Sequence, residues 1–352
     1  MSFIPTRNQS PLRMFMEMAK QHTPECLFPK TGGDFKEWKA KTKPRVLETL
    51  GRWPDMVDLN PEFVGEWIDR GVLKRRYLID VAPGISASLQ VNLPEGKTKE
   101  KLPAIQCWHG HGLYGKDAVM GNQINAEVEA HIRGYNYDYG LQLAQAGFAT
   151  YAIDWMGCGE RNDAAKPNFF NHLGERDWCN IYYLHATMFG MTSLSINLAH
   201  GKRATDFICT LPEIDASRLG VMGLSGGGTM AVWTPLVDDR FKAVEVICYS
   251  DVWAKFGIRD LNYCGMQVAP GLYQLIDVPD LQGLIAPTPL LVDVGANDSC
   301  FQLDNSMECF HRVEKIYEAA GVRENLELNL FAGGHAWNDA KSATFFKKHL
   351  PK

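Results

Sequence analysis

The sequence has 352 residues, which is enough for one large domain with insertions or for two small domains. Hydrophobic residues make up 45% of it and charged residues 22%, as in ordinary globular proteins, and the net charge at pH 7 is −5. Lysine and arginine form no cluster of the kind that binds nucleic acid, so we expect no nucleic-acid partner. No apolar run reaches the roughly 18 residues that a membrane-spanning helix needs, so we expect no membrane partner.

The N-terminus lacks the continuous apolar segment of a secretory signal peptide. The nine cysteines are an odd number and form no CxxC pair, and several lie inside apolar runs, as Cys107 and Cys248 do. Buried free thiols in a reducing compartment account best for this pattern. The sequence therefore predicts a cytoplasmic protein.

Residues 1–70 are predicted to form an N-terminal helical extension that packs on the main domain, because apolar residues recur at helical spacing in two parts of this segment. The remaining residues, 71–352, are predicted to form the main domain. It opens with residues 75–96, whose apolar residues alternate around Pro83 and Gly84 as those of a β-hairpin do.

Six further segments are nearly continuous apolar runs of strand length, which is typical of strands buried on both faces of a parallel sheet. These segments are residues 102–109, 147–154, 218–223, 241–249, 289–295 and 326–331. Helical patterns lie between several of them, over residues 139–147, 195–211, 227–237 and 309–321. This alternation predicts an α/β fold with a doubly wound, mostly parallel sheet and helices on both faces. The loops that follow the strands should then gather at one edge of the sheet.

Two long connections interrupt the alternation, at about residues 155–190 and 250–288. Loops of more than about 15 residues often cover or line a binding site, so we expect these insertions to shape one. Both are rich in aromatic residues. The candidates to line a pocket, which would also serve as ordinary packing residues, are Trp155, Trp178, Tyr182, Trp253 and Tyr263.

The residues Gly223-Leu224-Ser225-Gly226-Gly227 follow a predicted strand and precede a predicted helix. A serine at such a sharp turn has a strained backbone, and small residues two positions before and after it prevent a steric clash. Its hydroxyl then stands at a helix N-terminus, where the backbone N–H of Gly226 points at a developing oxyanion. We predict that Ser225 is a catalytic nucleophile. The turn lacks the lysine of a phosphate-binding loop, which excludes such a loop, and it fits the spacing of a dinucleotide site poorly.

A serine hydroxyl needs a histidine within hydrogen-bond reach to act as a nucleophile at neutral pH. His335 follows the last predicted strand and precedes the C-terminal helix, which would place it on the functional edge of the sheet. Asp298 follows the preceding predicted strand, where its carboxylate would fix the tautomer of the imidazole. We predict His335 as the base and Asp298 as the acid.

Asp251 competes with Asp298 for the role of the acid, because it also follows directly on a predicted strand. Asp154 ends another strand and is a weaker candidate for chemistry. We expect Asp154 to form a structural ion-pair network with Glu160 and Arg161 instead.

The loop Trp108-His109-Gly110-His111-Gly112 follows a predicted strand and is expected to supply the second oxyanion donor. We predict the backbone N–H of His111 in this role, with that of Gly112 as the alternative. Two histidines so close together also suggest a metal site. No carboxylate follows at metal-ligand spacing, however, so we expect no metal and predict that His109 braces the loop.

Three runs of the chain together resemble the α/β-hydrolase superfamily, in particular its dienelactone-hydrolase-like and acetyl-xylan-esterase-like members. The runs are residues 139–161, 211–230 and 268–301. The resemblance extends over about residues 75–345 and implies an α/β-hydrolase fold. It also implies a triad of Ser225, Asp298 and His335 that hydrolyses an acetylated carbohydrate or another small ester without a cofactor.

We therefore predict a serine hydrolase that cleaves a carboxylic ester through an acyl-enzyme on Ser225, with a small-molecule or carbohydrate ester as its partner. One alternative is a peptidase or amidase with the same triad, and another is a catalytically inactive binding protein of the same fold. The intact order of serine, aspartate and histidine favours an enzyme. The sequence leaves open the acyl group, the alcohol and the oligomeric state, a homo-oligomer included.

Overall fold

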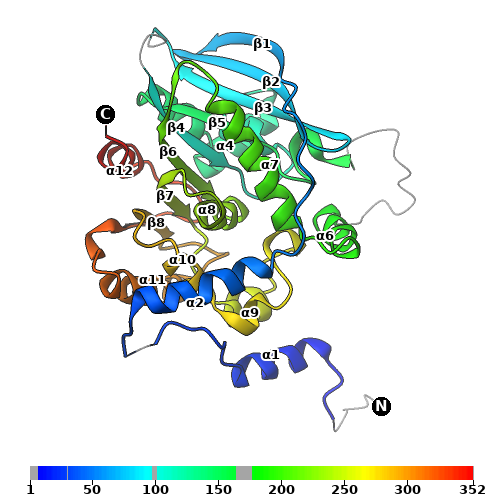
Figure 1. Ribbon diagram of the computed structural model, residues 1–352, viewed down its shortest axis with the longest axis vertical. Coiled ribbons are helices and arrows are strands. Elements are labelled where there is room, and N and C mark those ends of the chain that lie inside the picture. Colours follow the sequence, from blue (N-terminus) through cyan, green and yellow to red (C-terminus); the bar gives the residue numbers. More distant parts are fainter. Residues whose placement is uncertain (1–6, 30, 97–100, 164–176, 352) are drawn as a thin grey trace.

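The computed structural model describes residues 7–29, 31–96, 101–163 and 177–351. Within them the strands form one nine-stranded sheet in the order β1-β2-β3-β5-β4-β6-β7-β8-β9 (Figure 1). The strands are β1 (Glu62–Asp69), β2 (Val72–Ala82), β3 (Ile85–Pro94), β4 (Leu102–Trp108), β5 (Ala149–Ile153), β6 (Ile214–Leu224), β7 (Phe241–Ile247), β8 (Leu290–Gly295) and β9 (Leu326–Phe331). From β5 through β4, β6, β7 and β8 to β9, neighbouring strands run parallel. The pairs β1–β2, β2–β3 and β3–β5 are antiparallel. The predicted mostly parallel α/β sheet is therefore confirmed, as is the β2–β3 hairpin.

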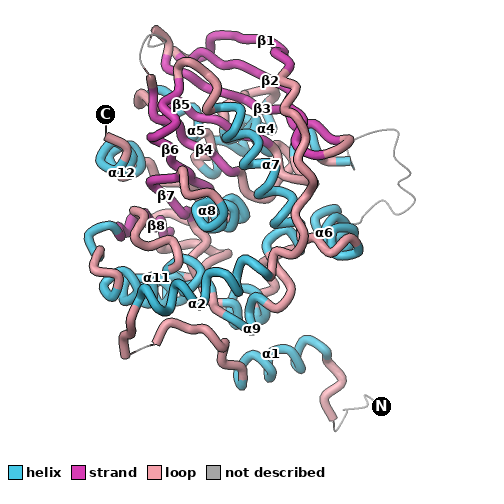
Figure 2. The backbone as a smooth tube through the Cα atoms, in the orientation of Figure 1, coloured by secondary structure: helices cyan, strands magenta, loops and turns pink. Residues whose placement is uncertain are grey.

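Helices cover both faces of this sheet, as the view in Figure 2 shows for α7 and α8 in front of the strands. The α-helices are α1 (Pro11–Gln21), α2 (Phe35–Glu48), α3 (Gly115–Val119), α4 (Ala126–Tyr135), α5 (Tyr139–Gln145), α6 (Trp178–Met188), α7 (Ser193–Ile208), α8 (Gly226–Val237), α9 (Leu272–Leu275), α10 (Val278–Gly283), α11 (Leu303–Ala319) and α12 (Ser342–His349). Shorter helical turns are η1 (Gly159–Arg161), the π-helical η3 (Trp253–Arg259), η4 (Gly265–Gln267) and η5 (Arg323–Asn325). In the described part of the chain, no helix combines the length and the apolar character needed to cross a bilayer.

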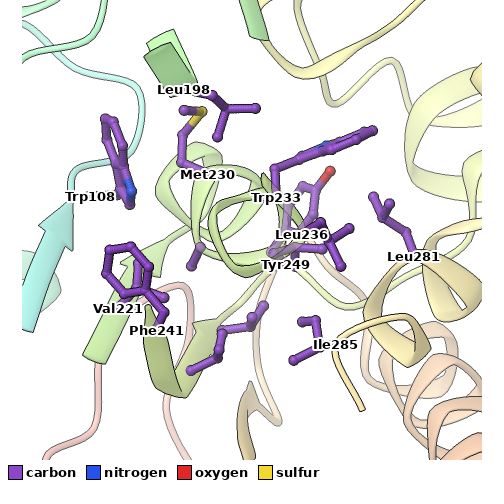
Figure 3. Packing of buried hydrophobic residues seen from close by; sticks show 14 of the residues in the cluster. Trp108, Leu198, Val221, Met230, Trp233, Leu236, Phe241, Tyr249, Leu281 and Ile285 are labelled. Atoms are coloured by element: carbon purple, nitrogen blue, oxygen red, sulfur yellow. The ribbon is translucent and has the colours of Figure 1, made fainter. Parts of the chain in front are cut away.

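The two faces of the sheet bury separate hydrophobic clusters, because successive side chains of a strand point to opposite sides. In β6, Val221 belongs to the cluster formed with α2, α7, α8 and α11, and the next residue, Met222, to the cluster formed with α3, α4, α5 and α12. Helix α8 lies at the centre of the first cluster, where Met230 and Trp233 are fully buried (Figure 3). The rigid sheet and α8 thus hold the turn between β6 and α8 in place.

The N-terminal extension differs from its prediction in two ways. Helix α1 buries none of its residues, whereas α2 packs on the main domain through Phe35 and Val46. The predicted boundary at residue 70 is wrong, because β1 pairs with β2 across the turn at Arg70 and Gly71 and so belongs to the sheet. The sequence gives a weak strand signal there, since β1 is an edge strand with most of its residues exposed and no continuous apolar run.

Both predicted insertions leave the sheet at the edge where the strands end. The first, residues 155–190, contains η1 and α6, and its residues 164–176 lie outside the described residues. The second, residues 250–288, contains η3, η4, α9 and α10. The two insertions meet where the backbone N–H of Gly265 donates to the Asn180 side chain at 2.8 Å.

Candidate active site

Ser225 occupies the turn between β6 and α8 with a backbone conformation that non-glycine residues rarely adopt. Its φ is 60° and its ψ is −119°, and its backbone N–H donates to the carbonyl of Ile247 in β7 at 2.9 Å. The strand, the neighbouring strand and the helix thus fix the turn together. The side chain is half-buried and lines a cavity, as a nucleophile that must reach a substrate would be.

The glycines on either side of Ser225 are required by close backbone contacts. A Cβ atom at Gly223 would lie 2.2 Å from the carbonyl oxygen of Gly227, and one at Gly227 would lie 2.2 Å from that of Trp108. Backbone atoms cannot move aside as a flexible side chain can. The two small residues predicted from the sequence therefore have the steric role that the strained turn needs.

His335 and Asp298, which are 37 residues apart in the chain, meet in the loops after β9 and β8. The distance from Nδ1 of His335 to Oδ2 of Asp298 is 2.8 Å. With Nδ1–H donating to the carboxylate, Nε2 remains as the acceptor that a serine hydroxyl needs. The ring stacks on Phe301 with 5.8 Å between centroids, and it lines the same cavity as Ser225.

The carboxylate of Asp298 is stabilised in its charged form. Its Oδ1 accepts hydrogen bonds from the backbone N–H groups of Cys300 at 2.7 Å and Phe301 at 3.0 Å. Burial opposes ionisation, but the hydrogen bond and charge of His335 together with these N–H groups outweigh it and lower the pKa of Asp298 below its ordinary value. An ionised acid is what a histidine needs to become an imidazolium during a reaction.

Asp251, the competing candidate, lies in a different environment. Its oxygens accept from the backbone N–H of Val252 at 2.7 Å and from the Asn305 side chain at 3.3 Å. Burial raises the pKa of Asp251 to about 6. The structure thus pairs His335 with Asp298, as we expected, and leaves Asp251 held by neighbours of its own.

The loop 109–112 presents few free backbone donors to the cavity. The N–H of Gly110 donates to the Tyr137 hydroxyl at 2.5 Å, and that of Gly112 points to the sulfur of Cys158. Among the described residues, no acceptor is found for the N–H of His111, which lines the cavity. His111, which lines the cavity, therefore remains the predicted oxyanion donor in this loop, with Gly112 as the alternative.

His109 braces this loop from below, as we expected. It is fully buried, and its two ring nitrogens lie 3.2 Å from the backbone nitrogen of Trp155 and 2.6 Å from the indole nitrogen of the same residue. Burial lowers the pKa of His109 to about 4, so the ring is neutral at physiological pH. A neutral buried imidazole positions a loop without bringing a charge into the core.

Asp154 forms a structural network, as predicted, but with a cation that the sequence analysis missed. Its carboxylate binds the buried ammonium of Lys116 at 3.0 Å and the backbone N–H groups of Lys116 and Glu160. Arg161 instead donates to the backbone carbonyl of Asp154. Lys116 lies in α3, shortly after the loop 108–112, but nothing local in the sequence marks it as the partner of Asp154.

The cavity above Ser225 has a volume of about 370 Å³. Of the aromatic residues expected to line it, only Tyr263 does so among the described cavity-lining residues, while Trp155 lies beneath the loop against His109 and Trp253 stacks on Phe256. Part of the opposite wall comes from His131, Tyr135 and Tyr137 at the end of α4. The sequence analysis missed this wall. The aromatic run Tyr135-Asn-Tyr137-Asp-Tyr139 directly before α5 is the signal that would have indicated it.

The sheet, the strained serine turn and the paired histidine and aspartate together define an α/β-hydrolase. The chain belongs to the Abhydrolase family, whose model matches residues 6–340. It is similar to the protein named "Putative hydrolase YtaP" from Bacillus subtilis (strain 168), with 24% identity over 306 residues that cover 84% of this chain and 94% of that protein.

Two solved structures share the fold over nearly the whole chain. A "putative acetyl xylan esterase" from Bacteroides fragilis matches with a TM-score of 0.72 and 17% identity, covering 92% of this chain and 83% of that one. A glucuronoyl esterase from Solibacter usitatus matches with a TM-score of 0.69 and 16% identity, covering 93% and 97%. At these identities the likeness establishes the α/β-hydrolase fold.

Proposed function

We propose that this protein is a serine hydrolase that cleaves a carboxylic ester through an acyl-enzyme on Ser225. The main observation behind the proposal is the position of His335. Its Nδ1 atom lies 2.8 Å from the Oδ2 atom of Asp298, and it lines the same cavity as the strained Ser225. A nucleophile, a base and an acid that orients the base are the minimum that acyl transfer by serine requires.

The reaction has two acyl-transfer steps. His335 takes the proton of Ser225 as the hydroxyl oxygen attacks the ester carbonyl, and the resulting imidazolium returns that proton to the departing alcohol. Water, deprotonated by His335, then attacks the acyl-enzyme and releases the acid. Asp298 stabilises the imidazolium in both steps, since its low pKa keeps it ionised.

The backbone N–H groups of Gly226 and His111 are proposed to hold the oxyanion. Gly226 is the first residue of α8, so its N–H lies at the positive end of the helix. Each such donor contributes about 10²–10³-fold to kcat in related chemistry.

The substrate is proposed to be a small ester, with acetylated or uronic-acid carbohydrate esters as the first candidates. A cavity of about 370 Å³ lies at the small end of ligand pockets. Its aromatic and polar wall, with Tyr135, Tyr263 and Asn262, suits a sugar ring with hydroxyl groups. The names of the two structural neighbours, an acetyl xylan esterase and a glucuronoyl esterase, support the same class.

The test compares wild type, Ser225→Ala and a matched control, Ser217→Ala, on p-nitrophenyl esters of increasing acyl length. Ser217 lies exposed on the same strand β6, so its hydroxyl is far from the cavity lining. We expect Ser225→Ala to lose about 10⁴-fold or more in kcat and Ser217→Ala to keep wild-type activity. Equal turnover by wild type and Ser225→Ala would refute the proposal.

The substrate class is tested on the wild-type protein. Release of acetate from acetylated xylo-oligosaccharides is compared with cleavage of a methyl glucuronate ester and of a p-nitroanilide. The proposal predicts hydrolysis of at least one ester far above the anilide. Anilide cleavage at a comparable rate would favour the peptidase or amidase alternative.

A further inference from the structure

Four side chains from three distant parts of the chain converge beside the cavity, and the proposed reaction uses none of them. They are His111 of the oxyanion loop, Cys158 just before η1, Cys179 in the first turn of α6, and Cys264 just before η4. We call them the thiol–imidazole cluster. One comes from the loop after β4, two from the first insertion and one from the second.

Three of the four donor atoms of the cluster lie close enough to share one ion. Nε2 of His111 and the sulfurs of Cys179 and Cys264 all lie within 4.8 Å of one another, and the His111–Cys264 pair is 2.8 Å apart. Cys158 neighbours Cys179 and interacts with its thiol, but its sulfur is not among the three donor atoms that all lie within 4.8 Å of one another. All three cysteines are free thiols in the structure.

Backbone donors surround the sulfurs. The N–H of Gly112 points to the sulfur of Cys158, and that of Met266 to the sulfur of Cys264. Such N–H groups offset the negative charge of thiolates and orient them, as the surroundings of metal ligands do. Cys158 and Cys264 are buried, Cys179 is half-buried and the exposed His111 leaves a way in from solvent.

We propose that the thiol–imidazole cluster binds one Zn²⁺ ion through three thiolates and the Nε2 atom of His111. Three cysteines and one histidine in a tetrahedron are one of the usual ligand sets of structural zinc. Bond lengths of about 2.3 Å to sulfur and 2.0–2.1 Å to nitrogen require donors about 3.6–3.8 Å apart. The 2.8 Å between His111 and Cys264 and the 4.8 Å limit on all three pairs of donors lie on either side of this value, and Cys158 would have to bring its sulfur to the same point as the fourth ligand.

The chemistry of the donors selects this metal. Thiolates with an imidazole favour zinc over magnesium or calcium, which prefer oxygen ligands. Binding displaces the thiol protons to solvent, so affinity rises with pH. Because all four positions are filled by the protein, the ion would be structural, without an open position for water.

A zinc ion bound by the cluster would connect both insertions to the loop 109–112 through its ligands. His111, which lines the cavity, would bind the ion through its side chain, and its backbone N–H would remain available for the proposed oxyanion contact. The ring also packs over the turn of the nucleophile, since a Cβ at Gly226 would lie 3.0 Å from its Nδ1 atom. The sequence analysis expected no metal because it looked for a carboxylate, whereas the partners here are cysteines without a recognisable spacing.

The test measures metal content and cobalt spectra on untagged, full-length protein. Zinc is counted by mass spectrometry of the purified chain, and Co²⁺ alone is added to protein stripped of metal. We expect one zinc per chain, and thiolate-to-cobalt charge-transfer bands with the intense visible bands of tetrahedral Co²⁺. Cys179→Ser should lose both, and the matched control Cys209→Ser, a half-buried cysteine outside the cluster, should keep both.

Three outcomes would overturn the proposal. The first is wild-type protein that neither carries zinc nor binds Co²⁺. The second is metal that Cys158→Ser, Cys179→Ser and Cys264→Ser all retain. The third is a thiol titration in denaturant, without reductant, that finds two thiols fewer than the nine cysteines, because a disulfide would then occupy the cluster. Wild-type measurements alone decide the first and third outcomes, so a variant that misfolds does not leave the question open.

Discussion

The backbone conformation of Ser225 depends on neighbouring residues whose side chains take no part in the proposed reaction. A non-glycine residue with a φ of 60° and a ψ of −119° stores about 1–3 kcal/mol of strain, which the surrounding structure must offset. The close backbone packing of Gly223, Gly227 and Trp108 offsets this strain, because it leaves no room for another conformation of the turn. The placement of the hydroxyl therefore depends on backbone packing as much as on the serine itself.

This dependence predicts the effect of Gly227→Ala. Its new Cβ would lie 2.2 Å from the carbonyl oxygen of Trp108, so we expect the protein to lose about 1–3 kcal/mol of unfolding free energy or more, and most of its esterase activity. The control is Gly134→Ala in α4, where a Cβ meets nothing within 4 Å and alanine favours the helix. Urea denaturation of both variants measures the difference. A Gly227→Ala protein as stable and active as wild type would show that the turn is not fixed in this way.

The two candidate acids lead to a second prediction at this scale. Asp298→Asn removes the charge that holds the His335 tautomer, so we expect kcat to fall by up to about 10⁴-fold with folding intact. Asp251→Asn keeps an acceptor for the N–H of Val252, and its new NH2 group can donate to Asn305 once the Asn305 amide flips, so kcat should change by less than about tenfold. Steady-state kinetics on a p-nitrophenyl ester distinguish them. A large loss in Asp251→Asn alone would reverse the assignment of the acid.

The residues of the site differ in how far the sequence could reveal them. Ser225, Asp298 and His335 each follow a strand with a clear apolar pattern, so their place on the sheet edge could be predicted one by one. The partner of Asp154 could not, because Lys116 reaches it from a short helix that has no motif. The same holds for Tyr137, whose contact with Gly110 exists only once the chain has folded.

At the scale of elements, the two N-terminal helices have different roles. Helix α1 lies alongside η3 and buries none of its residues, while α2 inserts Val46 into the core with no exposed surface. The apolar periodicity is stronger in α1 than in α2, although α1 is the helix that buries no residue. Periodicity indicates that a helix has an apolar face, but only the folded structure shows whether the face is covered.

We therefore expect deletion of residues 1–21 to leave thermal stability and esterase activity close to those of wild type. Since α1 buries no residue, little apolar area is lost. Val46→Ala in α2, by contrast, should cost about 1–3 kcal/mol because it removes two methyl groups from a packed core. Calorimetry of the two proteins tests the contrast. A deletion that destabilises the fold as much as Val46→Ala would mean that α1 is part of the core assembly.

The strands also differ in how well the sequence pattern predicted them. The six parallel strands β4 to β9 were predictable because burial on both faces requires continuous apolar runs. Strand β1 was missed because it lies at the exposed edge, pairs with β2 through its backbone and buries none of its side chains fully. Hydrophobic patterns report burial, so elements that bury little remain hidden from them.

At the scale of the whole molecule, two buried carboxyl groups on the neighbouring strands β7 and β8 link stability to pH. Glu245 in β7 and Asp293 in β8 are both fully buried, and burial together with the carboxyl of Glu245 raises the pKa of Asp293. A carboxyl whose pKa is higher in the folded than in the unfolded chain stabilises the fold below its unfolded pKa. That stability is lost as the pH rises through the folded pKa.

We therefore expect the contribution of Asp293 to the unfolding free energy to fall as the pH is raised above the ordinary aspartate pKa of about 3.9, so the pH slope of Asp293→Asn, which cannot ionise, should be less negative than that of wild type. The control is Asp215→Asn, because hydrogen bonds with Ser217 and Arg218 lower the pKa of Asp215 to about 2. Its contribution has the opposite sign and is lost only in acid, so it should leave the slope at neutral and alkaline pH unchanged. Urea denaturation across a pH series measures both. Equal slopes for Asp293→Asn and wild type would contradict the assignment.

The whole account depends on Ser225 forming a covalent intermediate, and labelling with a fluorophosphonate followed by peptide mass spectrometry tests this directly. We predict one label per chain, located on the peptide that contains Ser225 and absent from Ser225→Ala. Pre-incubation with a slowly hydrolysed ester should block the label. A protein that hydrolyses esters while the label settles on another residue, or on none, would contradict the account.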